Sequence, residues 1–172
     1  LTREDLSNLD LAGELGVTCV MQPFVRGRKD VENLRQALDQ RGLDIPIMAK
    51  IESRQGVERL DEILSAADQL CIARGDLGNT MPLWQLPGVQ KRIARRCREE
   101  KKPFCLVTQL LWSMQENPVP TRAEVADIYN GVLDGAAALM LTGETAIGKH
   151  PVQAMTYLVK TARCAMEDMG KG

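Results

Sequence analysis

Residues 47–53 read Ile47-Met48-Ala49-Lys50-Ile51-Glu52-Ser53, a short apolar run with a charged end. Pro46 and Gly56 bound the run, so the pattern predicts an extended strand. Because successive side chains of a strand point to opposite faces, Lys50 and Glu52 should share one side, about 7 Å apart. The stretch therefore predicts an ammonium and a carboxylate presented together at the end of a strand.

A second run of the same kind reads Cys71-Ile72-Ala73-Arg74-Gly75-Asp76-Leu77-Gly78. Gly75 allows the backbone to turn sharply, which leaves Asp76 just past the strand end. If the two strands are parallel neighbours, Lys50, Glu52 and Asp76 meet at one carboxyl edge, where parallel sheets and barrels hold their sites. Two carboxylates beside an ammonium indicate a divalent-cation site. A solvated ion-pair cluster is the alternative that the pattern leaves open.

The composition of the chain is that of an ordinary globular domain. It has 172 residues, of which 44% are hydrophobic, which is enough for one domain with a buried core. The 22 basic and 23 acidic residues give a net charge of -1, so no nucleic acid and no anionic membrane is expected as a partner. The five cysteines show no metal-ligand spacing and fall mostly in apolar runs, which favours a reducing, cytoplasmic location. Because the chain begins at Leu1 without a methionine, we expect a piece of a longer protein.

Candidate strands and helices alternate along the whole chain. Strands are expected over residues 18–21, 45–51, 69–74, 104–107 and 138–141. Helices are expected over residues 2–16, 29–40, 57–64, 89–100, 121–134 and 151–169, with a capping box from Thr121 and Glu124. Alternation of this kind predicts an α/β fold of parallel strands with right-handed crossovers. An open five-stranded sheet and part of an eight-stranded barrel both fit this pattern.

Five ordered motifs indicate which of the two it is. They are Met48-Ala49-Lys50-Ile51-Glu52, Ala73-Arg74-Gly75-Asp76-Leu77-Gly78, Thr108-Gln109, Pro120-Thr121-Arg122-Ala123-Glu124 and Met140-Leu141-Thr142-Gly143-Glu144-Thr145-Ala146. In their order and spacing these motifs resemble the pyruvate kinase family. The resemblance implies that residues 1–172 form the second part of the catalytic (β/α)8 TIM barrel, with about five strands. The first strands, the lid domain and the C-terminal regulatory domain would be absent.

The resemblance also implies an activity, phosphoryl transfer from phosphoenolpyruvate to ADP that gives pyruvate and ATP in glycolysis. Glu52 and Asp76 would bind the catalytic Mg²⁺ or Mn²⁺, since hard cations prefer carboxylate oxygens. Lys50 would lie over the transferring phosphoryl group and then face the enolate. The backbone N–H groups of Gly75 and Asp76 would hold the substrate carboxylate, and the hydroxyl of Thr108 would bind the same substrate.

Two further residues, Thr142 and Glu144, would belong to the network that relays a proton to the enolate carbon. For Thr108 and Thr142, a simple role as strand-end residues that cap the next turn is the alternative. The chain also departs from the family pattern. Pro23 stands where a serine near the monovalent-cation site is usual in the family, so K⁺ is a possible cofactor whose role is in doubt. Thr80 replaces the usual acid in a stretch that in the family packs at a subunit interface.

Five strands cannot close an eight-stranded barrel, so the sheet edges should be exposed unless another chain covers them. We therefore expect a homo-oligomer or pairing with a missing half-barrel, and an isolated chain that does not catalyse the full reaction. Two other functions fit the residues: a metal-dependent lyase of the related phosphoenolpyruvate/pyruvate barrel superfamily, and a non-catalytic binding or assembly module. Turnover that needs ADP separates the kinase from both.

Overall fold

Parallel strands form a single curved sheet in the computed structural model, which describes residues 1–170. Within this range there are five strands, in the spatial order β1-β2-β3-β4-β5. They are β1 (Val20–Gln22), β2 (Ile47–Ile51), β3 (Gln69–Ala73), β4 (Phe104–Val107) and β5 (Ala138–Met140). Every neighbouring pair is parallel, so the predicted α/β alternation is confirmed.

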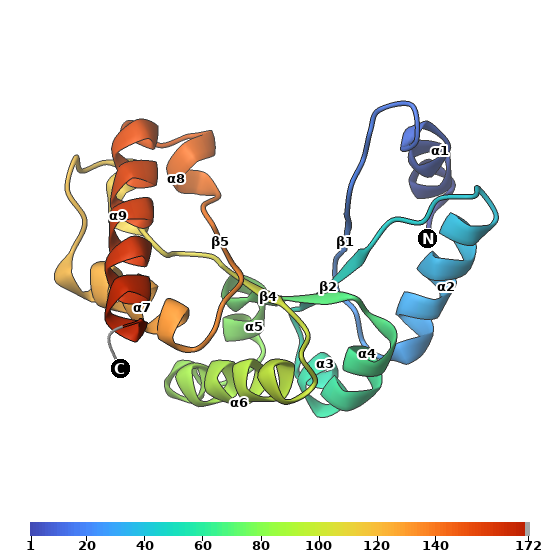
Figure 1. Ribbon diagram of the computed structural model, residues 1–172, viewed down its shortest axis with the longest axis horizontal. Coiled ribbons are helices and arrows are strands. Elements are labelled where there is room, and N and C mark those ends of the chain that lie inside the picture. Colours follow the sequence, from blue (N-terminus) through green and yellow to red (C-terminus); the bar gives the residue numbers. More distant parts are fainter. Residues whose placement is uncertain (171–172) are drawn as a thin grey trace.

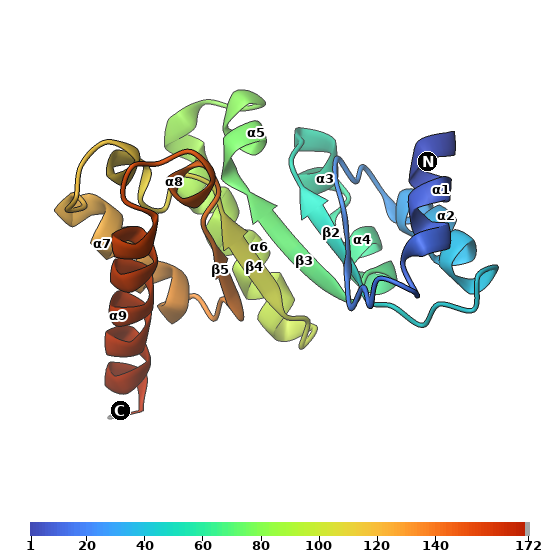
Figure 2. The same ribbon diagram turned by 90° about the horizontal axis from the view of Figure 1, so that it is seen from above.

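The connecting helices lie along one side of the sheet (Figure 1). They are α1 (Arg3–Leu11), α2 (Arg28–Asp39), α3 (Arg54–Glu58), α4 (Leu60–Ala66), α5 (Arg74–Asn79), α6 (Leu86–Glu99), α7 (Arg122–Leu133), α8 (Gly143–Ala146) and α9 (Pro151–Met169). Two short 3₁₀ helices, η1 (Leu83–Gln85) and η2 (Trp112–Gln115), complete the described elements. Figure 2 looks onto the other side, where the strands run side by side and α6 lies behind them. The shape is that of a trough, as expected for part of a barrel.

The two faces of the sheet bury different side chains. The face toward the helices is aliphatic and belongs to the main core, with Ile47, Ala49, Ile51, Leu70, Ile72, Phe104 and Leu106. The concave face carries a smaller cluster, with Cys71, Ala73, Cys105 and Val107 packed beside Met21, Met48 and Met140. Lys50 pairs with Cys71 in the β2–β3 register and so lies on this concave face. The alternation of β2 thus directs Lys50 away from the aliphatic core.

Several expected boundaries were wrong by a few residues for identifiable reasons. The first helix ends at Leu11, and the chain turns through Gly16, whose φ of 65° is unfavourable for other residues. The helix expected over residues 57–64 is two helices, because Arg59 (φ -105°, ψ 27°) departs from helical geometry between them. Arg74, expected to end a strand, instead begins α5.

Other local predictions are confirmed. The Glu124 N–H donates to Thr121 Oγ1 at 3.2 Å, and the Thr121 N–H donates to Glu124 Oε2 at 2.8 Å, which is the expected capping box. The last helix, α9, has the predicted bounds. No helix among residues 1–170 combines the length and hydrophobicity needed to cross a bilayer.

Candidate active site

Lys50 and Glu52 form an ion pair at the carboxyl end of β2, as the alternation of the strand predicts. Lys50 Nζ lies 2.7 Å from Glu52 Oε1, and the Glu52 side chain is only 1% exposed. The second carboxylate oxygen, Oε2, accepts a hydrogen bond of 2.7 Å from the backbone N–H of Phe24, which follows β1. Phe24 adopts a left-handed backbone conformation with φ of 49°. Glu52 is therefore a buried carboxylate held between Lys50 and the loop after β1.

Asp76 and Thr108 meet at the ends of the next two strands. Both line an open cleft of about 740 Å³, together with Gly75, Arg74 and Asp127. Asp76 lies in the first turn of α5, directly after β3, and its side chain is exposed. Within residues 1–170, neither the Asp76 carboxylate nor the Thr108 hydroxyl has a hydrogen-bond or ion-pair partner, so both are available to a ligand. The alternative in which Thr108 caps the next turn is therefore not supported.

Gly75 and Thr108 approach each other unusually closely. A Cβ atom at position 75 would lie 2.8 Å from Thr108 Cγ2, well inside van der Waals contact. Thr108 and Gln109 both have positive φ angles, 82° and 54°. A positive φ is a true outlier for a β-branched residue such as Thr108. Backbone strain of this kind persists only where the surrounding structure holds it.

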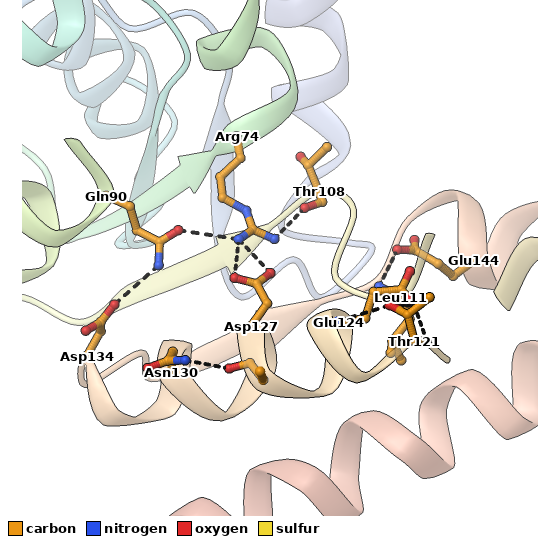
Figure 3. A network of polar contacts seen from close by, with 11 residues as sticks. Arg74, Gln90, Thr108, Leu111, Thr121, Glu124, Asp127, Asn130, Asp134 and Glu144 are labelled. Atoms are coloured by element: carbon orange, nitrogen blue, oxygen red, sulfur yellow. Dashed lines mark hydrogen bonds and ion pairs between the residues drawn. The ribbon is translucent and has the colours of Figure 1, made fainter. Parts of the chain in front are cut away.

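Arg74 holds Thr108 in this conformation (Figure 3). Its Nη2 donates to the carbonyl oxygen of Thr108 at 2.8 Å. Its Nη1 lies 2.7 and 2.8 Å from the two carboxylate oxygens of Asp127 on α7, and 3.4 Å from Gln90 Oε1 on α6. Gln90 in turn donates to Asp134, which is paired with Lys91. One polar network thus connects the strained peptide after β4 with α5, α6 and α7.

Thr142 and Glu144 lie together at the carboxyl end of β5. Glu144 is 1% exposed, and its Oε2 accepts a hydrogen bond of 3.0 Å from the Thr142 N–H. Its Oε1 accepts a hydrogen bond of 3.1 Å from the N–H of Leu111, in the loop after β4. The Thr142 side chain makes no capping hydrogen bond to α8, so a simple capping role is not supported. In the described part of the chain, no hydrogen bond or ion pair connects either residue to Lys50 or Thr108.

A fixed loop separates these two groups of residues. Glu124 accepts hydrogen bonds from the backbone N–H and the hydroxyl of Ser113, at 2.7 and 2.6 Å, in addition to those from Thr121. Burial raises the pKa of Glu124, but the hydrogen bonds from Ser113 and Thr121 outweigh it and leave that pKa below its ordinary value. The charged carboxylate therefore stabilises the segment that follows Thr108.

Two buried cysteines, Cys71 on the concave face and Cys97 on α6 in the main core, are unreactive. A hydrogen bond with Cys105 and burial both raise the pKa of the Cys71 thiol. Burial also raises the pKa of Cys97 to about 12. Thiols that stay protonated are poor nucleophiles and poor metal ligands, so these cysteines act as small hydrophobic residues.

Comparison with known proteins identifies this arrangement of strand ends. A family model described as the barrel domain of pyruvate kinase matches residues 1–155. The chain belongs to the pyruvate kinase family. It is 45% identical over 168 residues to a pyruvate kinase of Mycobacterium intracellulare, covering 98% of this chain and 35% of that protein. It is 45% identical over 165 residues to one of Lachancea kluyveri, with coverage of 96% and 33%.

A third pyruvate kinase, from Thermotoga maritima, is 47% identical over 140 residues, which is 81% of this chain and 30% of that protein. The chain thus spans about a third of the length of the curated relatives it matches. The five-stranded trough is accordingly part of a pyruvate kinase barrel, as the resemblance implied.

The carboxylates that follow β2 and β3 are of the chemical type that binds a divalent metal ion. Mg²⁺ in kinase sites is commonly held by one or two carboxylates, with substrate oxygens and water completing its shell. Glu52 and Asp76 follow the adjacent strands β2 and β3 and offer two such carboxylates. Among residues 1–170, no group of three or more His, Cys, Asp or Glu side chains is arranged to hold a metal. A cation at Glu52 would also compete with the ammonium of Lys50.

Sequence patterns did not predict a role for Arg74 or Asp127. Arg74 stands inside the Ala-Arg-Gly-Asp motif, and a charged residue that directly follows a buried strand is a usable signal. Asp127 gives no such signal, because a single acidic residue on an amphipathic helix usually faces solvent. Only the packing of α7 against the end of β4 shows its role.

Proposed function

We propose that this chain supplies the metal-binding and enolate-binding part of a cytoplasmic pyruvate kinase. The reaction is phosphoryl transfer from phosphoenolpyruvate to ADP, giving pyruvate and ATP in glycolysis. The observation that carries the proposal is that two groups of residues lie at the carboxyl ends of adjacent parallel strands. The buried Lys50–Glu52 pair ends β2, and the cleft with Gly75, Asp76 and Thr108 lies at the ends of β3 and β4.

In this proposal Glu52 and Asp76 hold Mg²⁺ or Mn²⁺. When bound, the metal offsets the negative charge of the phosphoryl group and the enolate. Lys50 adds a fixed positive charge at the same edge, where charge that develops in the transition state is stabilised. Its ion pair with Glu52 keeps the ammonium close to the reacting groups before a substrate arrives.

The substrate carboxylate binds at the end of β3 in this scheme. Gly75, Asp76 and Thr108 line the same cleft. We assign the hydrogen bonds to the carboxylate to the N–H groups of Gly75 and Asp76 and to the hydroxyl of Thr108. At β5, Glu144 fixes the Thr142 N–H, and we assign these two residues to the proton path that leads to the enolate carbon. Pro23 offers no side-chain oxygen, so we propose that this chain supplies no K⁺ ligand at that position.

The isolated chain is proposed to be incomplete as a catalyst. Phosphoryl transfer depends on positioning and charge neutralisation, and the family draws part of both from strands and a lid domain outside this segment. β1 and β5 are edge strands with unpaired backbone groups, which favours association with a second copy or with a complementary half-barrel.

The test is a chimera in which this chain replaces the matching segment of the Mycobacterium tuberculosis pyruvate kinase, to which it is 44% identical over 168 residues. Pyruvate formation is followed in a coupled assay, with and without ADP. Lys50→Met should lower kcat by about 1,000-fold, as does loss of other preorganised charges. Lys102→Met is the matched control. Lys102 donates to the Ala67 carbonyl at the amino ends of β3 and β4, away from the site. A folded chimera without ADP-dependent turnover, or normal turnover by Lys50→Met, contradicts the proposal.

A further inference from the structure

The strained peptide after β4 is held from outside its own segment. Thr108 and Gln109 have φ angles of 82° and 54°, a conformation that local hydrogen bonding does not explain. The missing Cβ of Gly75 lets the Thr108 methyl group lie against α5. The carbonyl oxygen of Thr108 accepts its hydrogen bond from Arg74, 34 residues earlier in the chain. The conformation of Thr108 therefore depends on how Arg74 is placed.

Arg74 is itself fixed on several sides. Its side chain is 13% exposed, and Asp127 neutralises it at 2.7 Å. Arg74 Nη1 donates to both Gln90 and Asp127, and Nη2 donates to the Thr108 carbonyl (Figure 3). A guanidinium is planar and remains charged, so it holds two acceptors in a fixed relation. Replacing a largely desolvated ion pair as a whole by apolar residues is often neutral for stability, whereas removing Arg74 alone would leave the charge of Asp127 uncompensated.

We propose that Arg74, oriented by Asp127, is a positioning residue that sets the Thr108 hydroxyl in the substrate cleft. Arg74 acts through the Thr108 carbonyl, and Asp127 acts through Arg74. The substrate part of this inference rests on the proposed function, in which the Thr108 hydroxyl contacts phosphoenolpyruvate. The positioning part rests on the contacts of Arg74 alone.

A double-mutant cycle in the chimera separates positioning from general support. Arg74→Met should lower kcat/KM about 30-fold when Thr108 is present, because displacements near 1 Å at a reacting group can cost about 100-fold. In a Thr108→Ala background the same substitution should cost less than about threefold, since there is no hydroxyl left to misplace. Asp127→Asn should show the same dependence with a smaller effect. Equal losses in both backgrounds would overturn the inference.

Amide hydrogen exchange gives a readout that does not need activity. Arg74→Met and Asp127→Asn should speed exchange in residues 108–111 by at least about tenfold, because the segment loses the contact that holds it. The control is Arg35→Met. Arg35 binds the Ile45 carbonyl at 3.0 Å and Asp68 at 2.5 Å, near the amino ends of β2 and β3. It should leave exchange in residues 108–111 unchanged.

The two experiments also separate this inference from the proposed function. A folded chimera that shows no turnover refutes the proposed function, and hydrogen exchange then decides the positioning role by itself. Unchanged exchange in both the Arg74→Met and the Asp127→Asn variant refutes the positioning role, even in an active chimera.

Discussion

Replacing Gly75 by alanine tests the close contact between α5 and β4. The new Cβ would lie 2.8 Å from Thr108 Cγ2, about 0.6 Å short of the 3.4 Å at which ordinary contact begins. Thr108 cannot yield easily, because its backbone is already strained and its carbonyl is bound by Arg74. Overpacking of this kind costs about 1–3 kcal/mol. A shift of Thr108 by several tenths of an ångström should also lower kcat/KM by about 10- to 100-fold.

The assay compares kinetics and melting temperature of the chimera carrying Gly75→Ala with those of two other variants. Gly88→Ala is the control, because nothing lies within 4 Å of its added Cβ, and a helical alanine should be neutral or stabilising by about 0.5–1 kcal/mol. Thr108→Ser removes Cγ2 and keeps the hydroxyl, so the double variant Gly75→Ala, Thr108→Ser should recover most of the lost activity. Normal kinetics for Gly75→Ala, or no recovery in the double variant, would refute the reasoning.

Three further predictions concern the Lys50–Glu52 ion pair, the Glu124 carboxylate and the edges of the sheet. Lys50→Met should tighten Mn²⁺ binding by about tenfold, because it removes the cation 2.7 Å from Glu52; weaker binding on titration would contradict this competition. Because the pKa of Glu124 is lowered in the folded state, its contribution to stability is present above about pH 4.5 and is lost as the pH falls through the lowered pKa. The stability difference between the wild type and Glu124→Gln in urea titrations should therefore shrink in acid, and a difference that grows there would be inconsistent. The isolated chain should show no useful turnover in the coupled assay and should oligomerise or scatter light, so an active, monodisperse monomer would rule this out.

The fold was predictable because two signals agree along this chain. Apolar runs such as residues 104–107 alternate with amphipathic segments, and Pro, Gly and capping residues mark their ends. The capping box of Thr121 and Glu124 and the start of α9 at Pro151 are local features, so they could be placed from sequence. The break at Arg59 and the end of α1 at Leu11 depend on packing and were misplaced.

The site was predictable to the extent that strand alternation determines it. Alternation placed Lys50 beside Glu52, and the turn at Gly75 placed Asp76 at the edge of the sheet. The left-handed backbone of Thr108 has no sequence signal, since threonine is an unfavourable residue for that conformation. The contact between Arg74 and Asp127 joins elements 53 residues apart, and a single sequence carries no record of such a pairing.

The central proposal is that Glu52, directly after β2, and Asp76, after β3, bind one metal ion. Mn²⁺ affinity measured by water proton relaxation tests this most directly. In the chimera, Glu52→Gln and Asp76→Asn should each weaken binding by at least about tenfold, and the double variant should bind more weakly than either single variant, because both carboxylates serve one ion. Asp61→Asn, which removes a carboxylate on α4 that is paired with Arg96, should leave the affinity unchanged. An affinity that only one of the two single variants weakens, or that the double variant leaves unchanged, would show that the two strand ends do not form a single site.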